Sequence, residues 1–178
     1  MIPVKTCCES REQYLTRPDL GRRFDQENSE IIRRSLPQRA RIQLVIGDGL
    51  SSAAILANAM DCAGPLHRLK NLRRGPGTIL YVENARVGSG DFIGDLTGCQ
   101  VMCILVGERP GLVTAESMSA YITYNPHTGI PESKRTVVSN IHRQGTPAVE
   151  AGAHIAQLLM KILEAKASGV DLLRGEVS

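Results

Sequence analysis

Tryptophan is absent from the sequence, and aromatic residues make up only 3% of its 178 positions. The core must therefore be built from Val, Ile, Leu, Ala and Met rather than from aromatic rings. Neither sign of charge dominates, because 21 Lys and Arg stand against 18 Asp and Glu, a net charge of +3. Nucleic-acid binders usually add interleaved aromatics or a long basic face. We therefore expect no nucleic-acid partner.

Long hydrophobic runs are also missing. No apolar stretch approaches the ~20 residues that a membrane-spanning helix requires, and no charged-then-apolar export segment opens the chain. The cysteines are odd in number and irregular in spacing, which argues against a disulfide framework and favours a reducing compartment. They are Cys7, Cys8, Cys62, Cys99 and Cys103. These features predict a cytoplasmic protein with no membrane partner.

Familiar catalytic motifs do not occur in the sequence. There is no Walker loop, Cys-x-x-Cys pair, His-Glu-x-x-His helix or nucleophile elbow. Ser139, Asn140 and His142 stand at the end of an expected strand, where they are either site residues or simply polar residues of a strand terminus. A self-contained enzyme would normally display a base, a nucleophile or a metal set. This sequence displays no convincing set of that kind.

The central feature is the apolar run Val101–Val106, which reads as a strand buried on both faces and is typical of a parallel sheet between helices. Such sheets bind ligands just beyond the carboxyl ends of their strands, and Glu108 and Arg109 stand at that place. The alternative is an ion pair between these two residues at a tight turn, with Pro110 fixing φ and Gly111 supplying a positive φ.

A second strand is expected over residues 41–46, and it leads through the loop Gly47–Ser52 into an Ala-rich helical segment. This order could place backbone N–H groups around an anion at the helix N-terminus. The match to a dinucleotide fingerprint is poor, because Ser52 replaces the third glycine and Asp48 would repel a pyrophosphate. A sharp glycine turn, with Ser51 or Ser52 capping the helix, is the better interpretation.

Periodicity and turn residues predict the remaining elements. Helices are expected to start within Thr16–Asp19 and run to Leu36, to cover Asp91–Gly98, and to run from a Thr146 cap through Pro147 to Gly169. Strands are expected over residues 78–82, 119–124 and 136–141, with a turn at Gly75–Gly77. The alternation of strands and helices predicts an α/β fold, a layered sheet with flanking helices. We expect one domain over residues 1–178, with residues 1–40 as an N-terminal extension and helix.

Several ungapped motifs follow one another between Tyr14 and Gly169. They are Tyr14–Arg23 (YLTRPDLGRR), Gly47–Ser51 (GDGLS), Gly107–Leu112 (GERPGL), Glu116–Ser117 (ES), Ser139–His142 (SNIH) and Gly145–Pro147 (GTP). In identity and order they resemble the small (light) subunit of ethanolamine ammonia-lyase.

The resemblance implies an adenosylcobalamin-dependent lyase that converts ethanolamine into acetaldehyde and ammonia. In that family the large subunit is a TIM barrel that holds the substrate and the radical chemistry. The small subunit has a Rossmann-like fold and closes the other side of the cobalamin pocket. Because the cofactor carries the difficult chemistry, this division of labour would account for the missing catalytic set. The runner-up hypothesis is a stand-alone Rossmann-like module whose Gly47–Ser51 loop holds a nucleotide.

The resemblance also implies which residues contact the cofactor, namely Val87, Glu108 and Val137. The carboxylate of Glu108 could accept hydrogen bonds from amides of the corrin rim or the nucleotide tail. The third family position is usually Cys, so Val137 would keep the shape without the thiol. Family members carry a longer N-terminal region with a microcompartment-targeting segment, and this sequence starts just before its Thr-Arg-Pro-Asp motif. Residues 60–77 and Val113 also depart from the family pattern.

Overall fold

The computed structural model describes residues 1–69 and 78–177. The strands are β1 (Ile2–Lys5), β2 (Ile42–Gly47), β3 (Leu80–Glu83), β4 (Val101–Gly107), β5 (Met118–Tyr124) and β6 (Arg135–Ile141). The helices are α1 (Arg11–Thr16), α2 (Gln26–Ser35), α3 (Ser52–His67), α4 (Ser89–Thr97), α5 (Ala148–Ala165) and α6 (Val170–Val177), with short 3-10 helices η1 (Leu20–Arg22) and η2 (Glu132–Lys134).

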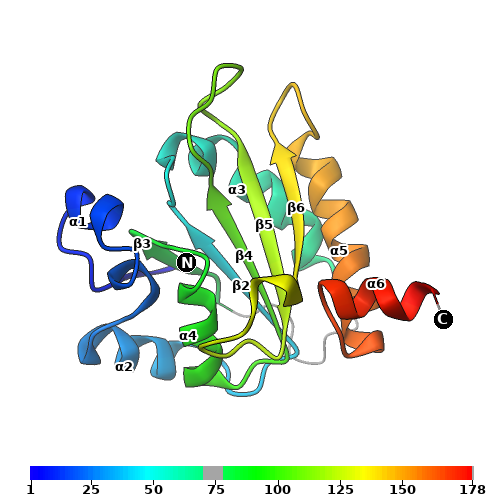
Figure 1. The fold of residues 1–178 in the computed structure, drawn as a ribbon, viewed down its shortest axis with the longest axis horizontal. Helices are drawn as coiled ribbons and strands as arrows, with labels where there is room; N and C mark the ends of the chain where they lie inside the picture. The colour runs from blue at the N-terminus through cyan, green and yellow to red at the C-terminus, as the bar shows by residue number, and fades with distance from the viewer. Residues whose placement is uncertain (70–77, 178) are drawn as a thin grey trace.

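The six strands form one mixed sheet in the order β1-β3-β2-β4-β5-β6 (Figure 1). The strands β1, β3, β2 and β4 run parallel to one another. The pairs β4–β5 and β5–β6 are antiparallel. The predicted α/β layered fold is confirmed. The expectation of a parallel sheet around the central strand is right on the side of β2 and wrong on the side of β5, because only a short loop joins β4 to β5.

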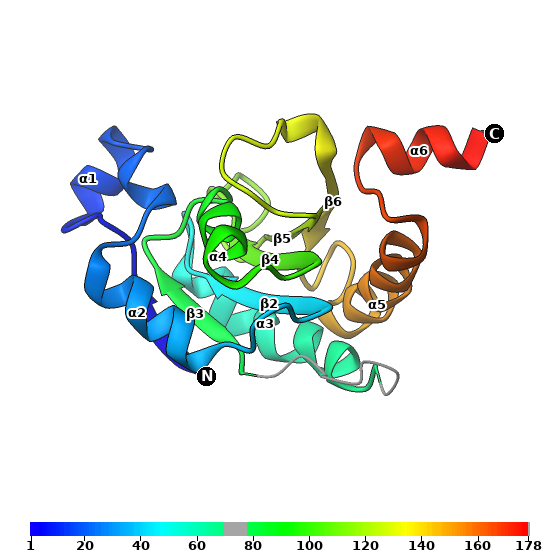
Figure 2. The ribbon, with the colours of Figure 1, turned by 90° about the horizontal axis from the view of Figure 1, so that it is seen from below.

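Helices cover the two faces of the sheet, and we name each face after a helix (Figure 2). The α3 face is covered by α3 and α5, and the α4 face is covered in part by α2 and α4. The central strand β4 contributes side chains to the apolar clusters on both faces. Its residues Val101, Cys103 and Leu105 belong to the α3-face cluster. The alternate residues Met102, Ile104 and Val106 join the α4-face cluster. The predicted burial of this strand on both faces is therefore confirmed.

Local signals place several elements as expected. The Oγ atom of Ser51 accepts a hydrogen bond from the backbone N–H of Ala54 at 3.1 Å, which caps α3. Gly98 adopts the left-handed conformation and ends α4. The strands predicted over 41–46, 78–82, 119–124 and 136–141 appear as β2, β3, β5 and β6 within two residues. The turn predicted at Gly75–Gly77 lies outside the described residues.

The N-terminal region differs from the prediction. A helix ends, rather than starts, at Thr16, because Pro18 disfavours helical geometry at Arg17, whose φ is −125° and ψ is 75°. The next long helix, α2, begins after Asp25, whose carboxylate accepts the backbone N–H of Asn28 at 2.8 Å. The strand β1 was not predicted, since its four residues show no usable periodicity.

The C-terminal helix also differs at both ends. Pro147 takes the N-cap position and Thr146 forms no side-chain cap, because the backbone groups of Thr146 bond Asn140 and His142 instead. The helix ends at Lys166, which is left-handed at φ 53°. Gly169, the predicted terminator, has φ +62° and begins the turn into α6, an element that was not predicted. None of the described helices is long and apolar enough to cross a membrane.

Candidate functional site at the open end of the α4 face

The loop after β2 is closed by its own neighbours. A Cβ atom at Gly49 would lie 2.3 Å from the carbonyl oxygen of Gly107, so the loop lies directly against the end of β4. The carboxylate of Asp48 accepts the backbone N–H groups of Asn84 at 3.0 Å and Ala85 at 3.1 Å. The loop's polar groups are thus used within the fold, which favours the capping interpretation over nucleotide binding.

The N-terminal segment covers the same edge of the sheet. Nη1 of Arg11 donates to the carbonyl oxygen of Gly49 at 2.7 Å. The ring of Tyr14 lies between the guanidinium groups of Arg11 and Arg86, at 4.6 and 4.4 Å from its centroid. Burial raises the pKa of Tyr14, although both arginines oppose the shift. The segment around Tyr14 therefore packs against the loop after β2 and the residues that follow β3.

The next segment along this edge, after β4, carries Glu108. Its Oε1 accepts a hydrogen bond from the phenol of Tyr121 at 2.7 Å. Among the described residues no ion pair joins Glu108 to Arg109, and Gly111 does not have a positive φ, so the alternative of an ion-paired turn is wrong. Burial and the hydrogen bond to the Glu108 carboxylate raise the pKa of Tyr121. The neutral phenol thus holds the carboxylate in one orientation.

The structure brings Val137 to the same place. Val137 pairs with Tyr121 across β5 and β6, so the two side chains share the α4 face. Its side chain is 49% exposed, an apolar group open to solvent on the sheet. Val87, in the loop between β3 and α4, packs against the α4-face cluster that Tyr121 also joins. The three predicted contact positions therefore lie on one face, and Tyr121 links Glu108 with Val137.

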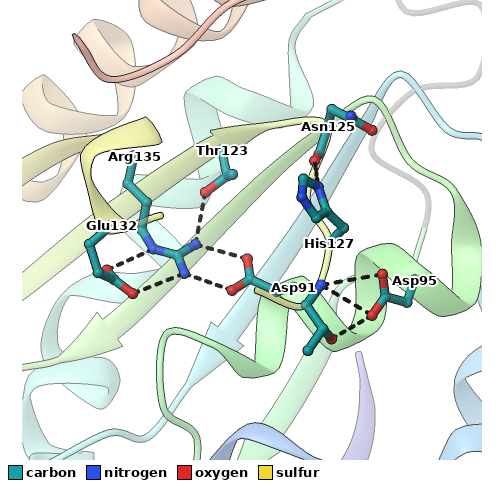
Figure 3. Close-up of polar contacts among 8 residues, drawn as sticks. Asp91, Asp95, Thr123, Asn125, His127, Glu132 and Arg135 are labelled. Carbon is teal, nitrogen blue, oxygen red and sulfur yellow. Dashed lines mark hydrogen bonds and ion pairs between the residues drawn. The ribbon is translucent and has the colours of Figure 1, made fainter. Parts of the chain in front are cut away.

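Two residues before Val137, Arg135 forms a buried ion pair with α4 (Figure 3). Its Nη1 and Nη2 donate to the two carboxylate oxygens of Asp91 at 2.8 and 2.6 Å. The two side chains are only 4% and 8% exposed. Burial disfavours the charged form of Arg135, but hydrogen bonds to Asp91 and Glu132 raise its pKa overall. The same hydrogen bond from Arg135 lowers the pKa of Glu132.

This ion pair lines a cavity of about 500 Å³ between η1, α4 and the start of β6. Its walls include Arg22, Gly88, Phe92 and Glu132. Asp95, also on α4 and labelled in Figure 3, accepts hydrogen bonds from the backbone N–H and the hydroxyl of Thr128. Charged groups and one aromatic ring thus border the open part of the α4 face.

A second cavity of about 500 Å³ lies beside Glu108 and is also lined by Asn140 and His142. His142 is buried, and its Nδ1 accepts the backbone N–H groups of Gln144 at 3.3 Å and Gly145 at 3.2 Å. The proton must therefore sit on Nε2, which donates to Oδ1 of Asn140 at 2.7 Å. Both ring nitrogens serve the turn after β6. Among the described residues no three His, Cys, Asp or Glu side chains form a metal-binding group.

Sequence reasoning missed Tyr121 and Arg135. The alternation within residues 119–124 could have placed Tyr121 and Thr123 on one face, because alternate residues of a strand share a face. Arg135 gave a weaker signal, a single cation at the start of an otherwise uncharged strand. Its partner Asp91 is 44 positions away, beyond the reach of local patterns.

The comparisons with known proteins point to one family. The model for "Ethanolamine ammonia-lyase light chain (EutC)" matches residues 1–173. A curated ethanolamine ammonia-lyase small subunit of Clostridium perfringens is 56% identical over 172 residues, which is 96% of this chain and 58% of the relative. A Listeria monocytogenes small subunit is 56% identical over 172 residues, 96% of this chain and 59% of its own.

A small subunit of Clostridioides difficile is 53% identical over 173 residues, covering 97% of this chain and 59% of its own. The chain thus spans 58–59% of the length of these curated relatives. The family match over almost all of the chain agrees with the motif resemblance at Tyr14–Arg23 and Gly107–Leu112. The chain therefore belongs to the ethanolamine ammonia-lyase light chain family.

Proposed function

We propose that the chain is the cofactor-binding small subunit of an adenosylcobalamin-dependent ethanolamine ammonia-lyase, which converts ethanolamine into acetaldehyde and ammonia. In this proposal the large subunit holds the substrate, and the two subunits enclose the cobalamin together. Residues 1–178 act as one Rossmann-like cobalamin-binding domain. The family membership supports the reaction, and the arrangement of the α4 face supports the role of this chain.

One observation carries the proposal, namely that Tyr121 orients the carboxylate of Glu108 and also pairs with the exposed Val137 across the sheet. In Figure 1, α4 lies in front of the lower part of the sheet, and no described helix lies in front of the upper parts of β5 and β6. A planar, partly apolar ligand rimmed with amides fits such a surface. Glu108 would accept hydrogen bonds from those amides, while Val87 and Val137 would supply apolar contact.

The protein's own part in the reaction is to bind and orient the cofactor. Adenosylcobalamin supplies the radical chemistry when bound, through homolysis of its cobalt–carbon bond. Tyr121 keeps the carboxylate of Glu108 from rotating, because its hydroxyl donates to one carboxylate oxygen and leaves the other available.

The location of the protein is part of the same proposal. We expect it in the cytoplasm, and inside a bacterial microcompartment where the family's targeting segment is attached. This expectation depends on the family alone, since no feature of the described surface bears on it.

Reconstitution tests the proposed function. The purified chain alone should show no lyase activity, and it should restore activity to the large subunit only when adenosylcobalamin is added. The large subunit with cofactor but without this chain is the matched control. If mixtures of the two subunits stayed inactive at every cofactor concentration, the proposed function would be wrong, while the fold would stand.

A further inference from the structure

The strand that carries Val137 lies at the edge of the sheet. Among the described strands β6 pairs with β5 alone, and this pairing contains a register shift between Met118 and Ala120. An edge strand of this kind can twist and shift more readily than a central one. A contact from outside the sheet can therefore help to fix the position of Val137 relative to Val87.

Arg135 supplies a geometrically complete attachment. A guanidinium group has five N–H donors. Nη1 donates to Asp91 and to Oγ1 of Thr123, Nη2 to Asp91 and Glu132, and Nε to Glu132. Each of the five donors thus has an acceptor, and the acceptors come from α4, β5 and η2. This planar arrangement fixes both the distance and the orientation between α4 and β6.

Stability alone does not account for this pair. Removing two charges from water is so costly that well-packed apolar residues at such a site are often equally stable or more stable. What an apolar pair lacks is the fixed geometry of a bidentate guanidinium–carboxylate contact. The pair is therefore better suited to define a position than to add stability.

We propose that Asp91 and Arg135 are positioning residues that hold β6 against α4 and so fix Val137 relative to Val87 and Glu108. This inference rests on the proposed function, because it assigns the pair to the cobalamin surface. Val137 lies two residues after Arg135 on the same face, and Val87 lies two residues before α4. The ion pair thus joins α4 to β6 close to both Val87 and Val137 in the sequence.

The test uses the complex of the full chain with its large subunit. We would measure the dissociation constant of cyanocobalamin by equilibrium dialysis, the apparent KM for adenosylcobalamin, kcat, and the Tm of the complex. Arg135→Lys keeps the charge without the fork, and Asp91→Leu/Arg135→Met replaces the pair with apolar side chains. Lys134→Met is the matched control, because Lys134 pairs with Asp171 in α6, away from α4.

We expect both the Lys variant and the double variant to raise the dissociation constant and KM about tenfold, since displaced positioning groups cost of this order. Their kcat at saturating cofactor should remain within about twofold of the wild type. The double variant should keep the wild-type Tm, and Lys134→Met should change neither constant.

A purely structural pair would give a different result. If the double variant had both the wild-type Tm and the wild-type dissociation constant, the positioning role would be overturned while the proposed function stood. An unchanged dissociation constant in Arg135→Lys would overturn it as well, even if the double variant did not fold. A wild-type complex that bound no cyanocobalamin and needed no adenosylcobalamin would overturn the proposed function itself.

Discussion

The two faces of the sheet are built from different kinds of contact. On the α3 face, two long helices pack on the strands through a continuous cluster of aliphatic residues, Ala, Met and Cys. On the α4 face, apolar packing covers only part of the strands. The remainder carries the Asp91–Arg135 ion pair and the Tyr121–Glu108 hydrogen bond.

The two faces are therefore suited to different tasks, the α3 face to stabilising the fold and the α4 face to binding a ligand. The free energy gained by burying apolar surface is roughly proportional to the buried area and does not depend on direction. The α3 face can therefore stabilise the fold without specifying a ligand. Directional polar contacts cost free energy when they are buried, yet they fix side chains in defined orientations. The α4 face uses them where the helical cover ends, which is where a site that must recognise amides would need them.

Removing Arg135 should affect stability most. In Arg135→Met the buried carboxylate of Asp91 loses its partner, and breaking a buried ion pair in this way costs about 3–5 kcal/mol. The free energy of unfolding from urea titration of the purified chain is the measurement. Asp91→Leu added to this variant should recover most of the loss. A single variant as stable as the wild type would show that the pair is not sealed from water.

Gly152→Ala should disrupt the packing of α5 on α3, on the α3 face. A Cβ atom at this position would lie 2.2 Å from the carbonyl oxygen of Cys62, so α5 and α3 would have to move apart. We expect a loss of about 2–3 kcal/mol in the free energy of unfolding, as for other overpacked cores. The urea titration measures this loss. The cyanocobalamin dissociation constant of the assembled complex should stay at the wild-type value, because the substitution does not touch the α4 face.

Gly64→Ala is the matched control on the same pair of helices. Among the described residues, no heavy atom outside the chain neighbours and the backbone of its own helix lies within 4 Å of a Cβ atom at Gly64, and this glycine has no positive φ. Alanine has the higher helix propensity, but Pro65 follows directly and disfavours a Cβ on a helical residue before it, so the free energy of unfolding should change by less than about 1 kcal/mol. A loss as large as that of Gly152→Ala would mean that the effect of Gly152→Ala does not come from the close approach of the helices.

Most of the fold followed from local patterns in the sequence. The unbroken apolar run of β4 indicated burial on both faces, and Ser51 indicated the start of α3, because both signals lie within a few residues of the element they define. Errors arose where longer-range contacts decide. Lys166 ends α5 in the left-handed conformation without being glycine, and Gly169 packs against Ser133 instead. The short strand β1 forms only because β3 pairs with it.

The site could be predicted less completely than the fold. The segment Gly107–Leu112 was expected to meet a ligand because it follows the central strand. The partner of Glu108 depends on the register of the β4–β5 hairpin and is 13 residues away, so the alternative of an ion pair with neighbouring Arg109 was wrong. The roles of Val87, Glu108 and Val137 came from the family resemblance and stay predictions.

Glu108→Ala tests the polar part of the α4 face directly. Hydrogen bonds to a charged group contribute about 1.5–3 kcal/mol, so the cyanocobalamin dissociation constant of the complex should rise at least about tenfold. Glu116→Ala removes an exposed carboxylate from the same loop and should leave the constant unchanged. Tm should not differ between the two variants. If Glu108→Ala bound cyanocobalamin as the wild type does, the turn after β4 would be structural only.

The smallest expected effect concerns α2, which packs on the α4 face through Ile32 and is also held at its N-terminus by polar contacts. Hydrogen bonds from the backbone N–H and the side chain of Asn28 lower the pKa of the N-cap residue Asp25, and Asn28 in turn accepts the backbone N–H of Lys5 in β1. Asp25→Ala should therefore lose about 1 kcal/mol at pH 7. Urea titrations at neutral pH measure this difference.

The sign of its pH dependence follows from the direction of the pKa shift. Because the pKa of Asp25 is lower in the folded chain than the ordinary value of 3.8, its stabilisation is complete above that value and disappears as the pH falls through the lowered pKa. The difference between wild type and Asp25→Ala should thus shrink in acid. Asp25→Asn keeps an acceptor that does not titrate, so its stability relative to Asp25→Ala should persist at low pH. Equal acid sensitivity in the wild type and Asp25→Asn would show that the charge of the Asp25 carboxylate plays no part in holding α2, and that the hydrogen bond of the cap is sufficient.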